Sequence, residues 1–340
     1  MTTMTTRFPL PTGFTVRPAA PDDAEEMAQV ANDYLEVSVG ARKVTVEEIQ
    51  ALFTIPGFDA ESSTLLVLSP EGLSAGMMLV MDLASPPVHP QLNGFVHPSF
   101  EGRGIGSFLL AWGEERSRRA LQRVPADARV SLYQGVGSTH ASSNALLQHY
   151  GWQAIRHSWL MMIELPEPPA APDWPAGITL CTYQDRPDLR AVYRAVNEAF
   201  QDHWGHVEQP EEQALERWEH RVASDPDFDP SVWFLALDGG EIAGMSLCQP
   251  RMPQDPEMGF VNQLGVRRPW RRTGLGLALL QHSFHALHAR GSRRVGLGVD
   301  AGSLTGATRL YEKAGMRPVQ QVTLYEKEIR PGEELGRQTL

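Results

Sequence analysis

Cysteine is scarce in this chain. Among its 340 residues only Cys181 and Cys248 are cysteines, and they stand far apart. Two such residues cannot form a disulfide framework, and they lack the paired spacing of a zinc site. We therefore expect no bound metal, and a reducing cytoplasmic environment is the default expectation.

Long apolar runs and excess positive charge are absent as well. No stretch approaches the roughly 18 consecutive apolar residues that a membrane-spanning helix needs, and Met1–Leu10 lacks the apolar core of a secretory signal. The formal net charge of -11 argues against general nucleic-acid binding and suits a cationic or amine partner. We expect no nucleic-acid and no membrane partner.

Two familiar phosphate-binding signatures are missing from the glycine-rich stretch Val261–Leu280. A Walker A loop needs a Lys followed by Ser or Thr after its glycines, and none is present. A dinucleotide fingerprint needs a third glycine, which Gly274-Leu275-Gly276 lacks. Neither loop type explains these glycines.

The same stretch nevertheless indicates a strand, a loop and a helix. Val261, Leu264 and Val266 form a short apolar run typical of a buried strand. After a turn rich in Pro, Gly and Arg, apolar residues recur at helical spacing over Leu275–Leu287. The loop therefore lies between a buried strand and the start of an amphipathic helix.

The start of that helix is a candidate anion site. Backbone N–H groups of a first helical turn have no intrahelical partner, and the helix dipole adds partial positive charge there. Gly274 and Gly276 carry no side chain that would keep a ligand from these amides, and Arg271 and Arg272 add formal charge. A pyrophosphate group would fit this chemistry.

The spacing Arg271-x-x-Gly274-x-Gly276 resembles the Q/R-x-x-G-x-G/A loop of the GNAT superfamily of N-acetyltransferases. The run Ala307–Met316 is similar to a second family pattern, L-Y-E-x-x-G-F. The resemblance implies acetyl-CoA as cosubstrate, with its pyrophosphate on the loop amides. It implies a site built from Leu264, Gly265, Val266, Arg271, Arg272, Thr273, Gly274, Leu275, Gly276 and Ser303, the last standing where many relatives have Asn.

The pattern occurs twice. Five prolines crowd Pro166–Pro175 and indicate a stiff linker, and the loops on its two sides align with an offset of about 170, as in an internal duplication. The first loop supplies Gly102, Arg103, Gly104 and Gly106 as further candidate CoA contacts. We predict domains over 1–165 and 178–330, a linker over 166–177 and a tail over 331–340.

The resemblance covers nearly the whole chain and implies its fold class. We expect a mixed α/β protein of two tandem GNAT-like domains. Each would have a central, mostly antiparallel sheet, splayed between its fourth and fifth strands and flanked by helices. We expect a monomer or a homodimer.

The two loops differ in ways that bear on catalysis. Glu101 stands where the family pattern has Gln or Arg, and a carboxylate beside a pyrophosphate is unfavourable. Tyr311 precedes Gly315 by four residues, a position where the family often has a general acid, whereas Leu147 stands at the same distance before Gly151. We therefore expect the first half to be catalytically silent.

The implied chemistry is direct attack of an amine of a small molecule on a thioester. By resemblance, Tyr311 would be the general acid and a backbone N–H near Val266 would polarise the carbonyl. The general base is open between Glu257, just before the predicted strand, and the segment that holds Asp202, His203, His206 and Glu208. The alternative function is a non-catalytic acyl-CoA-binding sensor or scaffold.

Overall fold

The computed structural model describes residues 8–40, 44–253, 255–303 and 306–338. It forms two compact units. Unit 1 contains Met1–Arg156 and Val322–Leu335, and unit 2 contains His157–Gln321 and Gly336–Leu340. The units therefore do not follow the order of the chain, since each includes a segment from the other side of the linker.

The sheet of unit 1 has mostly antiparallel strands, with one parallel pair between its fourth and fifth strands. The strand next to β5 comes from late in the sequence, where Val322–Arg330 of β12 pairs with Val130–Gly137. In spatial order the strands are β1 (Thr15–Arg17), β2 (Thr64–Leu68), β3 (Ser74–Met81), β4 (Gln91–Val96), β5 (Val130–Gly137) and β12 (Arg317–Arg330).

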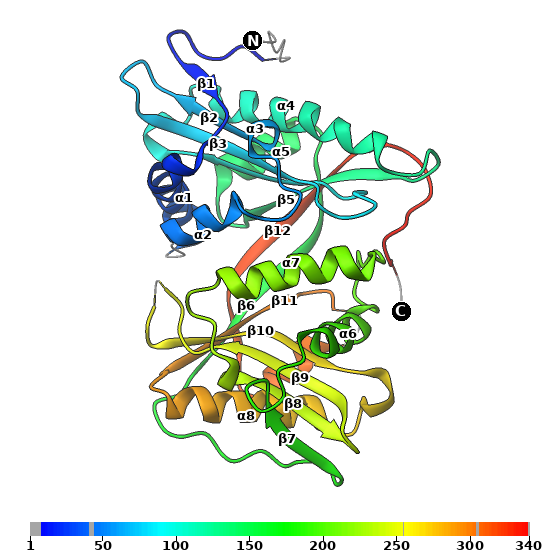
Figure 1. Ribbon diagram of the computed structural model, residues 1–340. Helices are drawn as coiled ribbons and strands as arrows, with labels where there is room; N and C mark the ends of the chain where they lie inside the picture. Colours follow the sequence, from blue (N-terminus) through cyan, green and yellow to red (C-terminus); the bar gives the residue numbers. More distant parts are fainter. Residues whose placement is uncertain (1–7, 41–43, 254, 304–305, 339–340) are drawn as a thin grey trace. The chain divides into compact units, whose positions relative to one another are not determined.

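Helices cover both faces of this sheet (Figure 1). One core forms under α4, around Leu109 and Trp112, and the other forms under α1, around Met27 and Leu66. The helices of unit 1 are α1 (Ala24–Val39), α2 (Val46–Leu52), α3 (Ala60–Ser63), α4 (Ile105–Ser117) and α5 (Ala141–His149), with 3-10 turns η1 (Pro21–Asp23), η2 (Pro98–Phe100) and η3 (Arg118–Gln122).

The sheet of unit 2 repeats this order. Ser158–Glu164 of β6 pairs antiparallel with β11, and β6 in turn neighbours β12, whose residues Arg317–Gln321 belong to unit 2. The sequence indicated Trp159–Leu165 as the last strand of the first domain; it is a strand, but it completes the sheet of unit 2. In spatial order the strands are β6 (Gln153–Glu164), β11 (Arg294–Asp300), β10 (Met258–Val266), β9 (Glu241–Gln249), β8 (Trp233–Asp238) and β7 (Ile178–Thr182).

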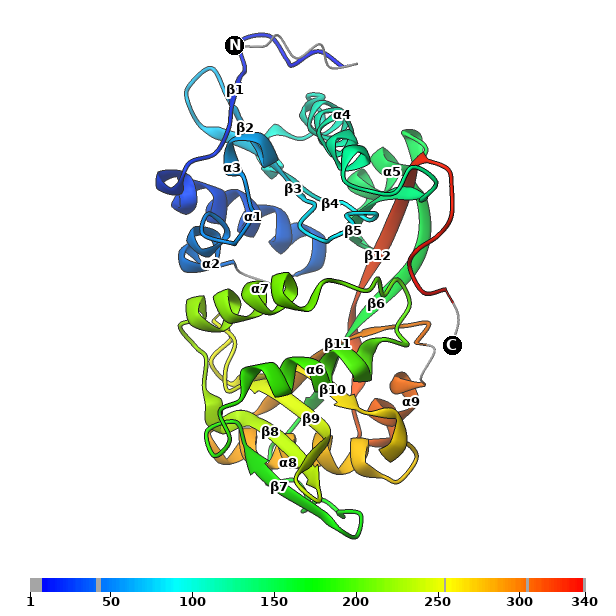
Figure 2. The same cartoon turned by 45° about the vertical axis from the view of Figure 1, so that its right-hand side comes forward.

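Unit 2 also has a core on each face of its sheet. Leu279, Phe284 and Leu287 of α8 pack on one face, and Val192 and Val196 of α6 pack on the other with α7. Figure 2 shows α9 beside the start of α8. The helices are α6 (Leu189–Phe200), α7 (Glu211–Ser224), α8 (Leu275–Ala289) and α9 (Ala307–Lys313), with 3-10 turns η4 (Pro230–Val232) and η5 (Arg268–Trp270).

The expected splay between the fourth and fifth strands is confirmed. In unit 2, β10 and β11 pair in parallel from Met258 to Val261, and the pairing stops there although β10 continues to Val266. In unit 1 the corresponding parallel pairing is a single contact, Gln91 with Tyr133. A gap between strands opens at the loop end of each sheet.

Two strand pairs correspond beside the splay, β9–β10 in unit 2 and β3–β4 in unit 1, and of these described pairs only β9–β10 has a β-bulge. The register of β10 on β9 shifts between Val261 and Gln263, so Asn262 is an extra residue, whereas the β3–β4 register runs without a shift. A bulge bends and twists its strand. The interrupted alternation of Val261, Leu264 and Val266 was a sequence signal for it.

Candidate functional site

The loop between β10 and α8 has an unusual backbone that recurs in unit 1. Gly274 has φ +94° and forms the N-cap of α8, and Arg272 is a non-glycine residue with φ +65°. In unit 1, Gly104 has φ +87° at the N-cap of α4, and Gly102 has φ +73°. The two loops therefore align with an offset of 170, and positions 104 and 274 require glycine in both.

The two glycines of the unit 2 motif have different tasks. A Cβ placed at Gly274 would meet nothing within 4 Å, so the space beside the N-terminus of α8 is open. A Cβ at Gly276 would lie 3.1 Å from Leu310 Cδ1, so this glycine allows α9 to pack closely on α8. Gly274 leaves room for a ligand at the helix N-terminus, and Gly276 brings the helix of Tyr311 to that place.

Helix α9 places Tyr311 in the core beneath the sheet. Its side chain is 8% exposed, and burial raises the pKa of its phenol to about 12. Ser303 precedes α9, and its hydroxyl oxygen accepts from the backbone N–H of Ala307 at 3.5 Å. The hydroxyl of Thr273 donates to the carbonyl of Trp270 within the loop. Tyr311 packs in the same apolar cluster as Leu275, the first residue of α8.

Asp202 lies beneath the loop. It is 2% exposed and forms ion pairs with Arg268 and Arg271, the latter at 2.7 Å. Hydrogen bonds from Arg268 and Arg271 hold the pKa of its carboxyl well below the usual range. A carboxylate of such low pKa is poorly suited to take a proton from an ammonium group.

His203 follows Asp202. Its ring lies 4.4 Å from that of Phe200, centroid to centroid. Desolvation first, and then the charge of Arg271, lower its pKa, while Asp300 at the end of β11 acts in the opposite direction. The imidazole is therefore within electrostatic reach of Arg271, in the loop after β10, and of Asp300, and it is neutral at pH 7.

Glu257 is placed elsewhere. It directly precedes β10, at the end where β10 and β11 are still paired, and its side chain is 64% exposed. Its carboxylate faces Arg294 at 3.7 Å. Nine residues of strand, about 30 Å at the usual rise, separate it from Val266. The structure does not bring Glu257 to the loop end of the sheet.

Sequence reasoning missed a contribution from the end of the chain. Within unit 2, the N–H of Gly205 donates to the carbonyl of Arg337 at 2.7 Å, and the N–H of Arg337 donates to the carbonyl of His206 at 3.0 Å. Trp204 Nε1 donates to Gln338 Oε1 at 2.9 Å. The predicted tail thus packs on the segment that carries His203. Nothing in the polar sequence at 336–338 signals this pairing.

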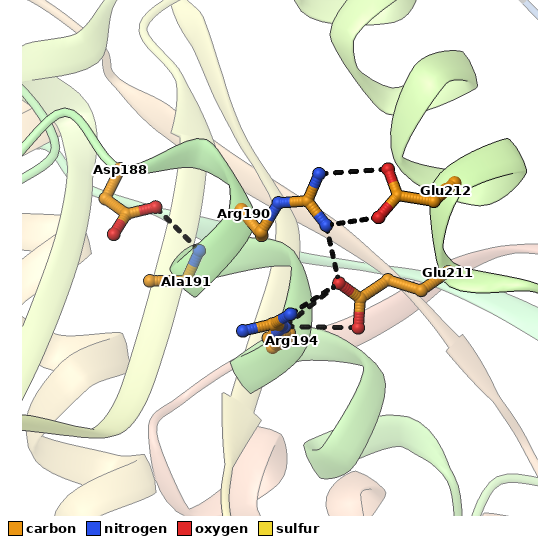
Figure 3. Close-up of polar contacts among 6 residues, drawn as sticks. All are labelled: Asp188, Arg190, Ala191, Arg194, Glu211 and Glu212. Atoms are coloured by element: carbon orange, nitrogen blue, oxygen red, sulfur yellow. Dashed lines mark hydrogen bonds and ion pairs between the residues drawn. The ribbon is translucent and has the colours of Figure 1, made fainter.

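The segment from Asp202 to Glu208 is also tied at its far end. Figure 3 shows Arg190 and Arg194 of α6 bridged to Glu211 and Glu212 at the start of α7. Asp188 caps α6 by accepting from the N–H of Ala191 at 2.9 Å. These pairs are exposed, so each contributes little and is weakened by salt. Together they fix where the segment between the two helices ends.

The corresponding place in unit 1 is filled differently. Glu101 accepts from the hydroxyl of Ser142 at 3.2 Å and faces His140 at 3.5 Å, so its carboxylate lies at the start of α5. Leu147, which is 1% exposed, occupies the place of Tyr311. Arg103 lies over the ring of Phe100, 5.2 Å from its centroid. Gly106 packs against Leu146 as Gly276 does against Leu310.

The described residues contain neither a metal-binding cluster nor a helix that could cross a membrane. No group of three or more His, Cys, Asp or Glu side chains there is arranged to hold a metal ion. None of the helices in the described ranges combines the length and apolarity that crossing a membrane requires.

Comparison with known proteins gives a consistent result. Residues 189–316 match the Acetyltransferase (GNAT) family. A mycothiol acetyltransferase of Thermobispora bispora is 30% identical over 305 residues, which cover 87% of this chain and 92% of the relative. One of Salinispora arenicola is 31% identical over 261 residues, covering 75% and 78%.

Solved structures agree with the sequence relatives. A GCN5-related N-acetyltransferase from Sphaerobacter thermophilus is 36% identical, with a TM-score of 0.77 over 96% of this chain and 99% of the other. A tandem GNAT protein from the clavulanic acid biosynthesis pathway, 17% identical, shares the fold with a TM-score of 0.70 over 94% and 100%.

The chain is therefore an acetyltransferase, an enzyme of the acyltransferase class. It belongs to the GNAT family, as the two sequence motifs indicated, and its fold is that of tandem GNAT proteins. Its similarity to the mycothiol acetyltransferases extends over most of both chains.

Proposed function

We propose that the enzyme transfers the acetyl group of acetyl-CoA to a primary amine of a small molecule, with the chemistry in unit 2. The observation that carries this proposal is the open N-terminus of α8 beside the splay. Gly274 leaves free space there, and the first-turn amides provide donors and partial positive charge for a pyrophosphate. A thioester entering the splay from this point would run along the exposed edge of β10.

The reaction would proceed by direct attack. The amine nitrogen forms a bond to the thioester carbonyl carbon, and the carbon–sulfur bond then breaks. The backbone N–H of Val266 would stabilise the carbonyl oxygen as it becomes negative. Tyr311 would protonate the departing CoA thiolate, since its raised pKa keeps the phenol protonated at neutral pH.

The amine must lose a proton before or during attack. Among the five residues first considered as bases, His203 has the most suitable position and protonation state. Its lowered pKa leaves it neutral at pH 7, and it lies in electrostatic reach of Arg271 and Asp300 on the two sides of the splay. Asp202 is held as a carboxylate by two arginines, and Glu257 lies at the other end of β10.

Unit 1 would be catalytically silent. Leu147 has no proton to donate, and Glu101 places negative charge where a pyrophosphate would bind. Its ion pair with His140 and its hydrogen bond with Ser142 tie the loop to the start of α5. The sensor alternative predicts that unit 1 binds CoA without turnover, and a binding measurement can test this.

The test is an acetyl-transfer assay with acetyl-CoA and a panel of amines. The relatives' name makes amines related to mycothiol the first acceptors to include. Release of free CoA thiol should depend on the amine, and mass spectrometry should show one acetyl group added to it. Saturable acetyl-CoA binding without amine-dependent CoA release would support the non-catalytic alternative instead.

A further inference from the structure

Arg271 is the charged residue of the loop motif, yet its side chain turns into unit 2. Its Nε donates to the carbonyl of Val266 at 3.0 Å, Nη1 to Asp202 Oδ2 at 2.7 Å and Nη2 to the carbonyl of Ala199 at 3.0 Å. All three guanidinium nitrogens therefore have partners in the protein. The side chain is only 28% exposed.

Asp202 anchors this guanidinium. Its side chain is 2% exposed, and it accepts from Arg268 Nε at 2.9 Å as well as from Arg271. Charge-assisted hydrogen bonds of this kind are short and directional. With the carbonyl of Ala199, near the end of α6, they fix the guanidinium at a set position relative to the end of β10.

The hydrogen bond from Arg271 to the carbonyl of Val266 shows to which side of β10 the N–H and C=O groups of Val266 point. Arg267 donates its N–H to the carbonyl of Ala243 in β9, so Arg267 faces β9. In an antiparallel pair, successive residues point their N–H and C=O groups to opposite sides. Val266 therefore points away from β9, where Arg271 binds its carbonyl and where β11 no longer pairs.

We propose that Arg271 is a positioning residue, held by Asp202, that fixes the end of β10 so that the N–H of Val266 points at the thioester carbonyl. This inference rests on the function proposed above. Positive charge for the pyrophosphate then comes from the helix amides and from Arg272, whose backbone lies at φ +65° in the loop. Adjacent arginines thus serve different parts of the reaction.

The experiment compares the effects on kcat and on cosubstrate affinity of substitutions at the neighbouring residues Arg271 and Arg272. Arg271→Lys keeps the charge but cannot reach three partners, and Asp202→Asn removes the anchor. Both should lower kcat by roughly 10- to 100-fold, as expected for a misplaced oxyanion donor, and leave CoA affinity within about twofold. The matched control Arg272→Gly suits the positive φ and should instead weaken acetyl-CoA binding several-fold with kcat retained.

A binding measurement provides a readout that does not need turnover. If Val266 N–H contacts the acetyl carbonyl, the wild-type enzyme should bind acetyl-CoA more tightly than CoA by calorimetry. Arg271→Lys and Asp202→Asn should both lose that difference while keeping their CoA affinity. The double variant should be no worse than either single one, because the two residues act as a unit.

Two results would overturn the inference. One is a loss of CoA affinity in Arg271→Lys with kcat retained, which would make Arg271 a phosphate ligand. The other is that Arg271→Lys and Asp202→Asn both match wild type in kcat and in their preference for acetyl-CoA over CoA. Wild-type enzyme that binds acetyl-CoA but transfers nothing to any amine would instead refute the proposed function. Circular dichroism and thermal unfolding of each variant confirm that it is folded.

Discussion

Gly205 and Arg337 are joined by a backbone hydrogen bond of 2.7 Å, in which the N–H of Gly205 donates to the carbonyl of Arg337. A second bond, from the N–H of Arg337 to the carbonyl of His206, joins the same two segments, and the two bonds together form a short backbone bridge. Residues from the end of the chain therefore stabilise the segment that carries His203, the proposed general base. Its conformation should depend on them.

Removal of residues 336–340 tests that dependence. The truncated enzyme loses the bridge but keeps Glu333, whose backbone bonds to Asp127 and Arg129 belong to unit 1. The KM for the amine should rise several-fold as the segment loosens, and acetyl-CoA affinity should stay near wild type. Steady-state kinetics with each substrate varied measures both.

The control for the truncation is Arg337→Ala. This variant removes the side chain and retains both backbone bonds, so its amine KM should be close to that of the wild type. Equal KM values for the truncated and full-length enzymes would mean that the bridge does not influence the acceptor side.

Gly274→Glu and Gly104→Glu compare the two loops. The first should place a side chain and a negative charge in the open space at the start of α8, and abolish detectable acetyl-CoA binding and turnover. The second alters only unit 1 and should leave turnover intact. Calorimetry and the transfer assay measure the two effects.

Alanine at the same two positions separates the effect of a side chain that fills the ligand space from the effect of backbone strain. Each alanine must adopt a positive φ, which costs roughly 1–2 kcal/mol of stability in either loop. Gly274→Ala should therefore lower the melting temperature but bind acetyl-CoA better than Gly274→Glu does. Similar turnover losses in the two glutamate variants would contradict the assignment of chemistry to unit 2.

Tyr311→Phe removes one hydroxyl from a buried ring. If the phenol protonates the CoA thiolate, kcat should fall by roughly a hundredfold or more, the usual range for a positioned acid, with acetyl-CoA affinity unchanged. Pre-steady-state release of CoA thiol reports the step directly. A variant with normal kcat, or with weakened acetyl-CoA binding alone, would assign Tyr311 to packing or binding.

The same tyrosine makes stability depend on alkaline pH. Its pKa is about 12 in the folded enzyme, where burial disfavours the phenolate, and about 10 in an unfolded chain. Between these values the unfolded state has lost the proton that the folded state retains, so stability falls as pH rises. The free energy of unfolding from urea titrations above and below pH of about 10 should show a decline in wild type that is smaller in Tyr311→Phe.

Local pattern was sufficient for the strand, loop and helix of the site, and the family resemblance implied the repeated fold. The strand ending at Val266, the loop glycines and the helix from Leu275 each follow from apolar spacing and backbone chemistry, which are properties of short segments. The same local view could not show where the Arg271 side chain binds. Its partners Asp202 and Ala199 are far away in sequence, and a surface arginine has the same local pattern.

The choice of strand partners was also beyond the sequence. The strand around Trp159–Leu165 and the strand at Val322–Arg330 have ordinary strand composition, and nothing in that composition says which sheet each one joins. The tail at Gly336–Gln338 is polar and short, so its pairing with Trp204–His206 left no periodic signal either.

Cutting the chain within the Pro-rich linker makes that partner choice measurable. A fragment of residues 1–170 lacks the part of β12 that covers β5, so it should expose an unpaired strand edge and aggregate. Co-expression with residues 171–340 should restore a folded, active complex. The control fragment carries residues 322–335 after a flexible linker and should be monodisperse by itself in size-exclusion chromatography. A well-folded 1–170 fragment would show that β12 is dispensable for unit 1.

The strand from the end of the sequence also sets an order of events on the ribosome. Domains usually fold as they emerge, the N-terminal one first. Here β5 is synthesised long before Val322–Arg330, the segment that pairs with it. Until that segment has been made, the edge of β5 that it covers has no partner. During that interval a nascent chain presents one open sheet edge to chaperones.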